Sequence, residues 1–226
     1  MGLNHGTNIV KDGLVFYVDA ANQRSYPGSG TTWTTLKGSN NVTLLGGPTF
    51  SSDDLGSIVF DGIDDNAQIE GNPGVTQNIF NATANSVCAW VYNTNLSTDA
   101  TVVGLWSGQY ILYMDTDGAG GGYRVIYVTG GGNRGTSTDN VNAIQDQWQY
   151  VVSTFTNETS VSLYVDGNHI QTQTGVSSNL NTSTNNIAIG ADAPNGIRDW
   201  PGRISNVSFY DKALSTKHTQ LSLIHI

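Results

Sequence analysis

The sequence predicts an all-β fold, a two-sheet antiparallel sandwich of the jelly-roll type, on three observations. Short runs rich in β-branched and aromatic residues recur along the 226 residues, with turn residues between them. Only 12% of the residues are charged, and Glu, a helix-favouring residue, occurs only at Glu70 and Glu158. Helical periodicity is not sustained anywhere, so the strands must bury their apolar faces by stacking two sheets or closing a barrel, and we favour the sandwich.

The predicted strands follow one another along the whole chain. The first, residues 13–20, alternates, with Leu14, Phe16 and Val18 on one side. The other runs are closed by turn residues and span residues 57–62, 67–71, 86–93, 101–106, 110–115, 123–130, 149–156, 160–167, 169–174, 186–190 and 202–211. One helical turn is expected near residues 78–84 and another after Leu214.

The pair Asp166-Gly167 stands between two strand-like runs, VSLYV and NHIQT. A type I′ turn needs positive φ at both central residues, and Asp-Gly is a strong signal for it. We therefore predict a two-residue hairpin there and no chemical role for Asp166. The glycine-rich segments 117–123 and 129–135 are also predicted to be hairpin loops, not interdomain linkers.

Charge and composition limit the classes of partner. The net charge of −9 and the scattered Lys and Arg residues argue against nucleic acid as a partner, because phosphate contacts need clustered positive charge. The sequence shows no signal-peptide pattern and no transmembrane run, so no membrane insertion is expected. Cys88 is the only cysteine and lies in an apolar run, which predicts a buried free thiol and no disulfide.

Three segments in order resemble the laminin-G-like, concanavalin A-type sandwich family. They are SIVFDGIDDNAQI (57–69), WQYVVSTFT followed by SVSLYVDGN (148–168), and WPGRISNVSFYDKALS (200–215). The opening IVKDGLVFYVDAANQRSYPGSGTTW (9–33) looks closest to a branch found in bacteriophage and marine-virus virion or tail-fibre proteins. The resemblance implies one laminin-G-like domain over residues 9–220, after an N-terminal arm of residues 1–8.

Calcium is the candidate cation. The chain departs from the family where related sandwiches carry an Asp that helps to bind a structural calcium, because Ser205 stands there, and Thr35 and Asn66 also depart from the pattern. The segment FDGIDDN nevertheless gathers carboxylates, and calcium prefers oxygen ligands. The candidate metal ligands are Asp61, Asp64 and Asp65. In the alternative interpretation, Asp61 only accepts backbone hydrogen bonds in an Asx turn.

We expect no enzyme activity. Retaining glycosidases on this fold carry an E-x-D-x-x-E pattern, whose two catalytic carboxyl groups must lie about 5 Å apart. The pattern is absent here, and Asp115 and Asp117, the nearest approach to a pair, are better explained by turn chemistry. The G-x-S-x-G pattern of serine hydrolases is also absent.

Sugar binding requires aromatic faces and a few well-placed polar groups. We predict such a surface on consecutive strands and their loops between residues 106 and 134, together with the Trp before the last strand. The candidate ligand-binding residues are Trp106, Tyr110, Tyr113, Asp117, Tyr123, Arg134 and Trp200. Partly buried packing is the alternative for each. Trp90 and Trp148 lie in core-like runs and are interpreted as structural.

The final residues 221–226, LSLIHI, break the preceding pattern. One possible set of codons for them, CTG-TCT-CTT-ATA-CAC-ATC, resembles a transposase-type sequencing adapter. We therefore predict that these residues are an artefact of a truncated environmental sequence read. A genuine C-terminal edge strand is the alternative.

The leading interpretation of function is a non-catalytic carbohydrate-binding or adhesion module of a phage or virus structural protein. Such a module would be assembled in the host cytoplasm and displayed on the virion surface, with a host-surface glycan or other virion proteins as partners. One alternative is a purely structural or decoration domain without a ligand. Another is a bacterial lectin or adhesin, which would be extracellular or at the cell surface.

Overall fold

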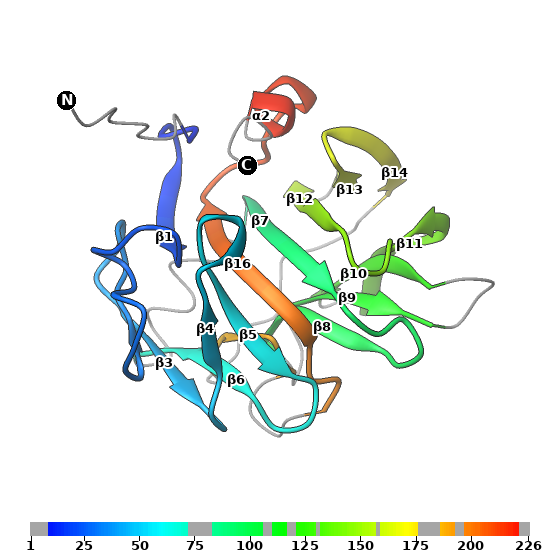
Figure 1. Ribbon diagram of the computed structural model, residues 1–226. Coiled ribbons are helices and arrows are strands. Elements are labelled where there is room, and N and C mark those ends of the chain that lie inside the picture. The colour runs from blue at the N-terminus through cyan, green and yellow to red at the C-terminus, as the bar shows by residue number, and fades with distance from the viewer. Residues whose placement is uncertain are drawn as a thin grey trace.

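Two antiparallel β-sheets stack face to face to form the molecule (Figure 1). The computed structural model describes residues 9–71, 83–105, 110–116, 121–129, 132–156, 159–175, 186–192 and 197–221, with the backbone alone for residues 129, 132–142 and 221. Within these ranges each sheet has eight strands. The predicted all-β jelly-roll sandwich is confirmed.

Sheet A carries the first and last strands of the domain at its centre. Its strands in spatial order are β14 (Asn168–Thr174), β13 (Ser160–Val165), β12 (Trp148–Thr156), β7 (Ala84–Asn93), β16 (Pro201–Tyr210), β5 (Ser57–Asp61) and β4 (Thr49–Ser51). The first half of β16 pairs with β5, and its second half pairs with β1 (Leu14–Asp19). The register of β16 on β7 shifts between Ile204 and Asn206, where these two halves meet.

Sheet B covers the inner face of sheet A. Its strands in spatial order are β11 (Gly132–Asn142), β10 (Gly122–Thr129), β9 (Tyr110–Asp115), β8 (Ala100–Leu105), β15 (Ala188–Ile189), β6 (Asn66–Ile69), β3 (Val42–Leu45) and β2 (Thr32–Trp33). A 3-10 helix η1 (Asp53–Leu55) and a short α-helix α2 (Thr216–Leu221) complete the described elements.

Each predicted strand is present, and the helical turn predicted after Leu214 is α2. Four strands, β2, β3, β4 and β11, were not predicted. The segment 129–135 is not wholly a loop, because residues 132–135 belong to β11. The predicted turn at 78–84 lies outside the described residues except for its last two positions, and Ala84 begins β7. The predicted arm 1–8 and residues 222–226 of the predicted artefact also lie outside them.

The Asp166-Gly167 hairpin is confirmed. Asp166 and Gly167 have φ values of 50° and 71°, as a type I′ turn requires, and Val165 of β13 pairs with Asn168 of β14. The Asp166 carboxylate also accepts a hydrogen bond of 2.8 Å from the backbone N–H of Tyr150. The turn therefore fixes the position of the neighbouring strand β12.

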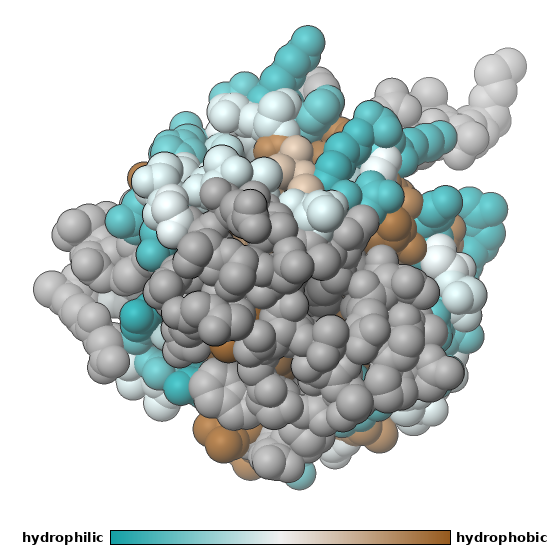
Figure 2. Space-filling view, turned by 180° about the vertical axis from the view of Figure 1, so that it is seen from behind, coloured by the Kyte–Doolittle hydropathy of each residue, from teal (hydrophilic) through white to brown (hydrophobic). Residues whose placement is uncertain are grey.

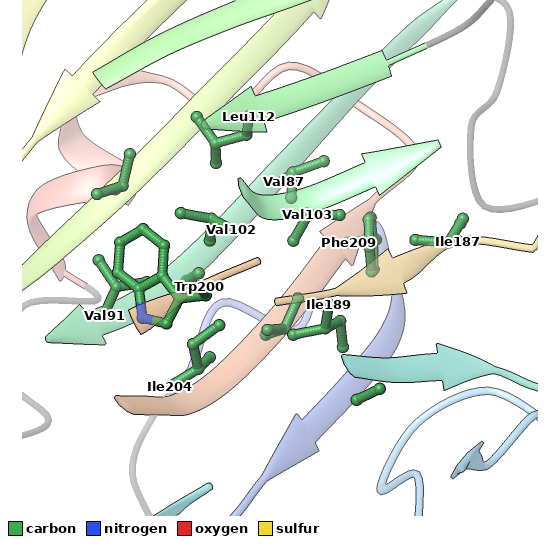
Figure 3. Close-up of a cluster of buried hydrophobic side chains, with 14 of the residues drawn as sticks. Val87, Val91, Val102, Val103, Leu112, Ile187, Ile189, Trp200, Ile204 and Phe209 are labelled. Carbon is green, nitrogen blue, oxygen red and sulfur yellow. The ribbon is translucent and has the colours of Figure 1, made fainter. Parts of the chain in front are cut away.

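The main core lies between the two sheets, where alternate residues of each strand point inward. Figure 3 shows part of it, with Trp200 packed beside Val91 and Ile204. A second apolar cluster covers the opposite, outer face of sheet A. Its buried members are Leu14, Tyr17, Cys88, Trp90, Tyr150, Val152, Tyr164, Tyr210 and Leu214. Both faces of β7 are therefore apolar, and the predicted buried thiol of Cys88 is confirmed on the outer one.

The surface seen from behind in Figure 2 is mostly hydrophilic where it belongs to described residues, and hydrophobic residues form small separate patches on it. None of the helices in the described ranges has the length and apolar character needed to cross a membrane.

Candidate functional site

The outer face of sheet A carries a row of aromatic and polar side chains across four strands. Trp90 of β7 is the direct cross-strand partner of Tyr150 in β12 and of Asn206 in β16. Asn206 in turn lies opposite Asp19 of β1. Residues that lie directly opposite in a sheet place their side chains on the same face. The row is therefore dictated by strand register.

A pocket opens on this row. The Trp90 pocket, as we name it, is lined by Ile9, Tyr17, Trp90, Tyr150, Asn206, Ser208 and Tyr210. The rings of Trp90 and Tyr150 lie 5.2 Å apart between centroids with an interplanar angle of 37°. The pocket thus combines aromatic walls with hydroxyl and carboxamide groups, as a site for a small polar ligand requires.

Two polar groups of the Trp90 pocket have no partner within the described ranges. The indole nitrogen Nε1 of Trp90 is buried and has no hydrogen-bond acceptor there. The half-buried carboxamide of Asn206 makes no hydrogen bond there either. The Tyr17 hydroxyl, by contrast, donates to the Asp19 carboxylate at 2.9 Å. The pocket therefore has one buried N–H donor and one half-buried amide group without partners among the described residues.

The next row along the same face extends the aromatic surface. Tyr92 of β7 is paired with Trp148 of β12 and Arg203 of β16. The Arg203 guanidinium lies 4.1 Å from the centroid of the Tyr92 ring and 5.5 Å from that of Trp148. The indole N–H of Trp148 donates to Asp54 at 2.9 Å. Tyr92 and Trp148 are half-buried, so their ring surfaces are partly open to solvent.

A separate group of carboxylates lies in the loop between β5 and β6. Asp61, Asp64 and Asp65 each bring one oxygen to within 4.8 Å of the others. Asp61 also accepts the backbone N–H of Ile63 at 2.8 Å, so it forms the Asx turn of the alternative interpretation as well. Burial, and secondly the charges of Asp61 and Asp64, raise the pKa of Asp65 above its ordinary value.

Most of the sequence matches a known protein family. The family profile described as the Concanavalin A-like lectin/glucanases superfamily matches residues 60–219. The chain belongs to this superfamily. No curated protein sequence matches the chain.

Several solved structures of the superfamily fold are similar to the chain at low sequence identity. Domain 4 of an extracellular arabinanase from Geobacillus stearothermophilus, solved in complex with arabinotriose, has a TM-score of 0.68 at 15% identity, covering 92% of this chain and 98% of that one. The botulinum neurotoxin serotype D ligand-binding domain, solved in complex with N-acetylneuraminic acid, has a TM-score of 0.68 at 13% identity. That match covers 94% of this chain and 51% of the other, so the chain spans about half of that domain. A Trypanosoma rangeli sialidase mutant displaying trans-sialidase activity has a TM-score of 0.65 at 16% identity, covering 93% of this chain and 33% of that one.

The calcium position of related superfamily sandwiches does not fit the residues present here. Ser205 has taken the place of the expected Asp, and its buried hydroxyl donates to the backbone carbonyl of Gly56 at 3.0 Å. The backbone carbonyl of Ser205 accepts the N–H of Ala20 at 2.8 Å. Direct hydrogen bonds therefore join the three segments, and the position has no carboxylate for a cation.

Three of the aromatic residues predicted to form the sugar-binding surface lie in the core. Tyr110 and Tyr123 are 1% exposed and Trp200 is 0% exposed, so none of them has a ring face open to a ligand. The two phenols instead bridge the sheets. The Tyr110 hydroxyl lies 2.7 Å from the Ser153 hydroxyl, and the Tyr123 hydroxyl donates to Gln149 at 3.1 Å. Burial raises the pKa of both tyrosines.

Among the other predicted residues, the structure describes the side chain of Tyr113 alone. Tyr113 lies on the outer face of sheet B, is 5% exposed, and donates to Asp115 at 3.2 Å. Trp106 and Asp117 lie outside the described residues, and for Arg134, on β11, only the backbone is described. Trp90 and Trp148, interpreted from the sequence as structural, belong to the apolar cluster on the outer face of sheet A. Trp90 is 7% exposed there, which confirms its buried position, and Trp148 is half-buried against the cluster. Strand alternation separates two faces but does not say which of them meets the other sheet, so the sequence alone does not place this cluster on the outer face.

Proposed function

We propose that the domain is a non-catalytic carbohydrate-binding module and that its ligand binds at the Trp90 pocket. The observation that carries the proposal is the unpaired indole N–H of Trp90 in a pocket walled by aromatic rings. A buried donor without an acceptor costs about 1–3 kcal/mol, and a sugar hydroxyl oxygen that accepts from it would remove this cost.

The chemistry of the residues that line the pocket suits a sugar residue. The apolar faces of pyranose and furanose rings pack on aromatic side chains, and their hydroxyl groups need donors and acceptors close by. Trp90 and Tyr150, which are 7% and 3% exposed, line the pocket with their rings, and the half-buried Asn206 carboxamide offers both a donor and an acceptor. The half-buried Tyr92 and Trp148 lie one row away on the same face, where a second sugar unit would reach them.

The comparisons support a sugar ligand and a role in binding. The arabinanase domain and the neurotoxin domain share this fold, and each was solved with a saccharide. The chain lacks the paired-carboxylate pattern with which retaining glycosidases of this fold cleave sugars. Binding without cleavage is therefore the function that we propose.

The biological setting is part of the same proposal. The resemblance of residues 9–33 to a bacteriophage and marine-virus branch supports a module displayed on a virion, where it would bind host-surface glycans. Contact with other virion proteins is compatible with this setting, because β14 is an exposed edge strand of sheet A.

A glycan array that includes bacterial surface polysaccharides tests the proposal. The full chain is compared with Asn206→Ala and with Gln171→Ala, a matched change of an exposed amide on β14. We expect binding by the full chain and by Gln171→Ala, and at least about a fivefold loss of affinity for Asn206→Ala, since about one hydrogen bond to the ligand is lost. A folded chain that binds nothing on the array would favour the purely structural role, and equal binding by all three proteins would place the ligand elsewhere.

A further inference from the structure

A second row of side chains crosses the outer face of sheet A beside the Trp90 pocket. Tyr92 of β7 lies directly opposite Trp148 of β12 and Arg203 of β16. The Tyr92 and Trp148 rings meet edge to face at 5.6 Å, and the Arg203 guanidinium lies 4.1 Å from the centroid of the Tyr92 ring. We name these three side chains the Tyr92 row. Both aromatic residues are half-buried, so part of each ring is open to solvent.

Several donors of the Tyr92 row have no hydrogen-bond acceptor. The Arg203 guanidinium forms ion pairs with Asp54 at 3.5 Å and with Asp53 at 3.9 Å, but no hydrogen bond among the described residues. The Tyr92 hydroxyl makes no hydrogen bond there either. A guanidinium has five N–H donors in a fixed plane. The row therefore combines aromatic surface with N–H and O–H groups that are available to a ligand, as a sugar site requires.

The η1 turn holds the Trp148 ring in place. The Asp54 carboxylate accepts the indole N–H of Trp148 at 2.9 Å and also pairs with Arg203. Asp54 and Leu55 have φ values of 51° and 76°, a backbone region that residues with a Cβ atom rarely adopt. Such strain persists only where the surrounding structure supports it, and the contacts of Asp54 with Trp148 and Arg203 supply that support. The Trp148 ring is therefore oriented before a ligand arrives, which lowers the cost of binding.

The charges around the Tyr92 row disfavour an anionic ligand. The side chains of Asp53 and Asp54 are 79% and 46% exposed, and both pair with the single guanidinium of Arg203. Two carboxylates and one guanidinium leave one net negative charge here, and the whole chain carries −9. A carboxylate or sulfate group on a sugar would meet this negative field and would compete with Asp54 for Arg203. A neutral sugar avoids both costs.

We propose that the Tyr92 row is a second sugar subsite and that the ligand is a neutral polysaccharide chain running along β7. The row takes this role only if the ligand is a carbohydrate, so the assignment rests on the proposed function. Trp90 and Tyr92 are two residues apart on β7, and their side chains share the outer face, which places the two rows about 6.4–6.8 Å apart. A sugar ring at one row thus leaves the other row to the next unit of the chain.

Native electrophoresis in gels that contain a soluble polysaccharide tests the proposal. The neutral probes are mannan, arabinan, galactan, dextran and β-glucan, and the acidic probes are alginate and polygalacturonate. The full chain is compared with Trp148→Ala and with Arg203→Met, which keeps an unbranched side chain but loses every N–H donor. Arg24→Met is the matched control, because Arg24 is exposed and its side chain has no ion pair or hydrogen bond among the described residues.

We expect at least one neutral polysaccharide, and neither acidic one, to retard the full chain and the Arg24→Met control. The dissociation constant obtained from the retardation should rise about fivefold in Trp148→Ala, which loses an aromatic face, and about tenfold in Arg203→Met, which loses charge-assisted hydrogen bonds. Thermal unfolding of each variant shows whether it is folded. Arg203→Met is decisive if Trp148→Ala does not fold.

Three results would overturn the proposal. The first is retardation of both row variants equal to that of the parent; if Asn206→Ala is then retarded less, the Trp90 pocket is the whole site. The second is no retardation of the parent by any neutral probe, and binding of short glycans on the array would then leave the proposed function standing. The third is retardation by alginate as strong as by any neutral probe. Conversely, if the row variants bind weakly and Asn206→Ala binds as the parent does, the Tyr92 row is the sugar site and the Trp90 pocket is not.

Discussion

Trp90 and Tyr150 are direct cross-strand partners, and their rings lie 5.2 Å apart on the outer face of sheet A. Tyr150 is itself held from the other side, because Asp166 in the hairpin turn accepts its backbone N–H and donates its own N–H to the Tyr150 carbonyl, each at 2.8 Å. The turn between β13 and β14 thus fixes one wall of the Trp90 pocket.

Trp90→Phe should weaken sugar binding without unfolding the domain. Phenylalanine keeps an aromatic face but removes the indole N–H, so affinity should fall about fivefold to tenfold, the worth of one hydrogen bond of about 1–1.4 kcal/mol. Tyr164→Phe, which removes a polar group from the same face outside the pocket, is the control and should bind as the parent does. Titration calorimetry with the best glycan from the array measures both. Unchanged affinity in Trp90→Phe would exclude the indole N–H from binding.

Asp166→Ala should destabilise the fold, whereas Asp166→Asn should be nearly neutral. Asp166 has a φ of 50°, and its carboxylate bonds to the Tyr150 N–H. Alanine loses the hydrogen bond and tolerates positive φ poorly, so we expect a loss of about 1–2 kcal/mol in the free energy of unfolding. Asparagine keeps both properties and should stay within about 0.5 kcal/mol of the parent. Urea unfolding followed by fluorescence distinguishes the two. A loss as large for Asn as for Ala would mean that the negative charge matters most.

Gly202→Ala should be far more damaging than Gly30→Ala. Both glycines have positive φ, 143° and 95° respectively. A Cβ atom at Gly202 would overlap the Tyr92 carbonyl oxygen, whereas nothing lies within 4 Å of one at Gly30. Backbone strain alone should cost Gly30→Ala about 1–2 kcal/mol, and the added clash should raise the cost for Gly202→Ala to roughly 3 kcal/mol or more. Chemical denaturation of the two variants measures the difference, and equal losses would show that β7 and β16 can separate to admit a methyl group.

The strands with clear alternation could be predicted from the sequence, and the remaining strands could not. β2, β3 and β4 have two to four residues, too few for a period of two to be recognised. Most residues of β11, GNRGTSTDNVN, favour turns, and it is a strand because β10 pairs with it. Tertiary pairing overrides local preference at these places.

The site was harder to predict, for a different physical reason. Tyr110 and Tyr123 carry hydroxyl groups, which favours a surface position, but the facing sheet supplies Ser153 and Gln149 as partners inside the core. Trp90 lies in an apolar run because both faces of β7 are covered by apolar clusters. The acidic loop was predictable, since Asp61, Asp64 and Asp65 are close in sequence. The pairing of β5 with β16, which places Pro201 opposite Asp61, joins segments far apart in the sequence and was not predictable.

Cys88 should be unreactive until the protein unfolds. Burial raises the pKa of its thiol from 9.0 to about 12, so the thiolate, which is the reactive form, is scarce at pH 8. We expect no alkylation by iodoacetamide in the native state at pH 8 and one label per chain in guanidinium. Since the folded state holds the thiol proton more tightly than the unfolded state, this contribution to stability is complete below about pH 9 and is lost as the pH rises toward 12. Rapid labelling of the native protein would contradict the buried position on the outer face of sheet A.

The indole N–H signals of the five tryptophans report whether a sugar binds at the Trp90 pocket. A two-dimensional ¹H–¹⁵N spectrum of the full chain is recorded with and without the best glycan from the array, and Trp90→Phe and Trp200→Phe assign two of the signals. We expect that the Trp90 signal moves on binding, while that of Trp200, buried between the sheets, does not. A bound glycan that leaves the Trp90 signal in place would contradict a sugar site at this pocket.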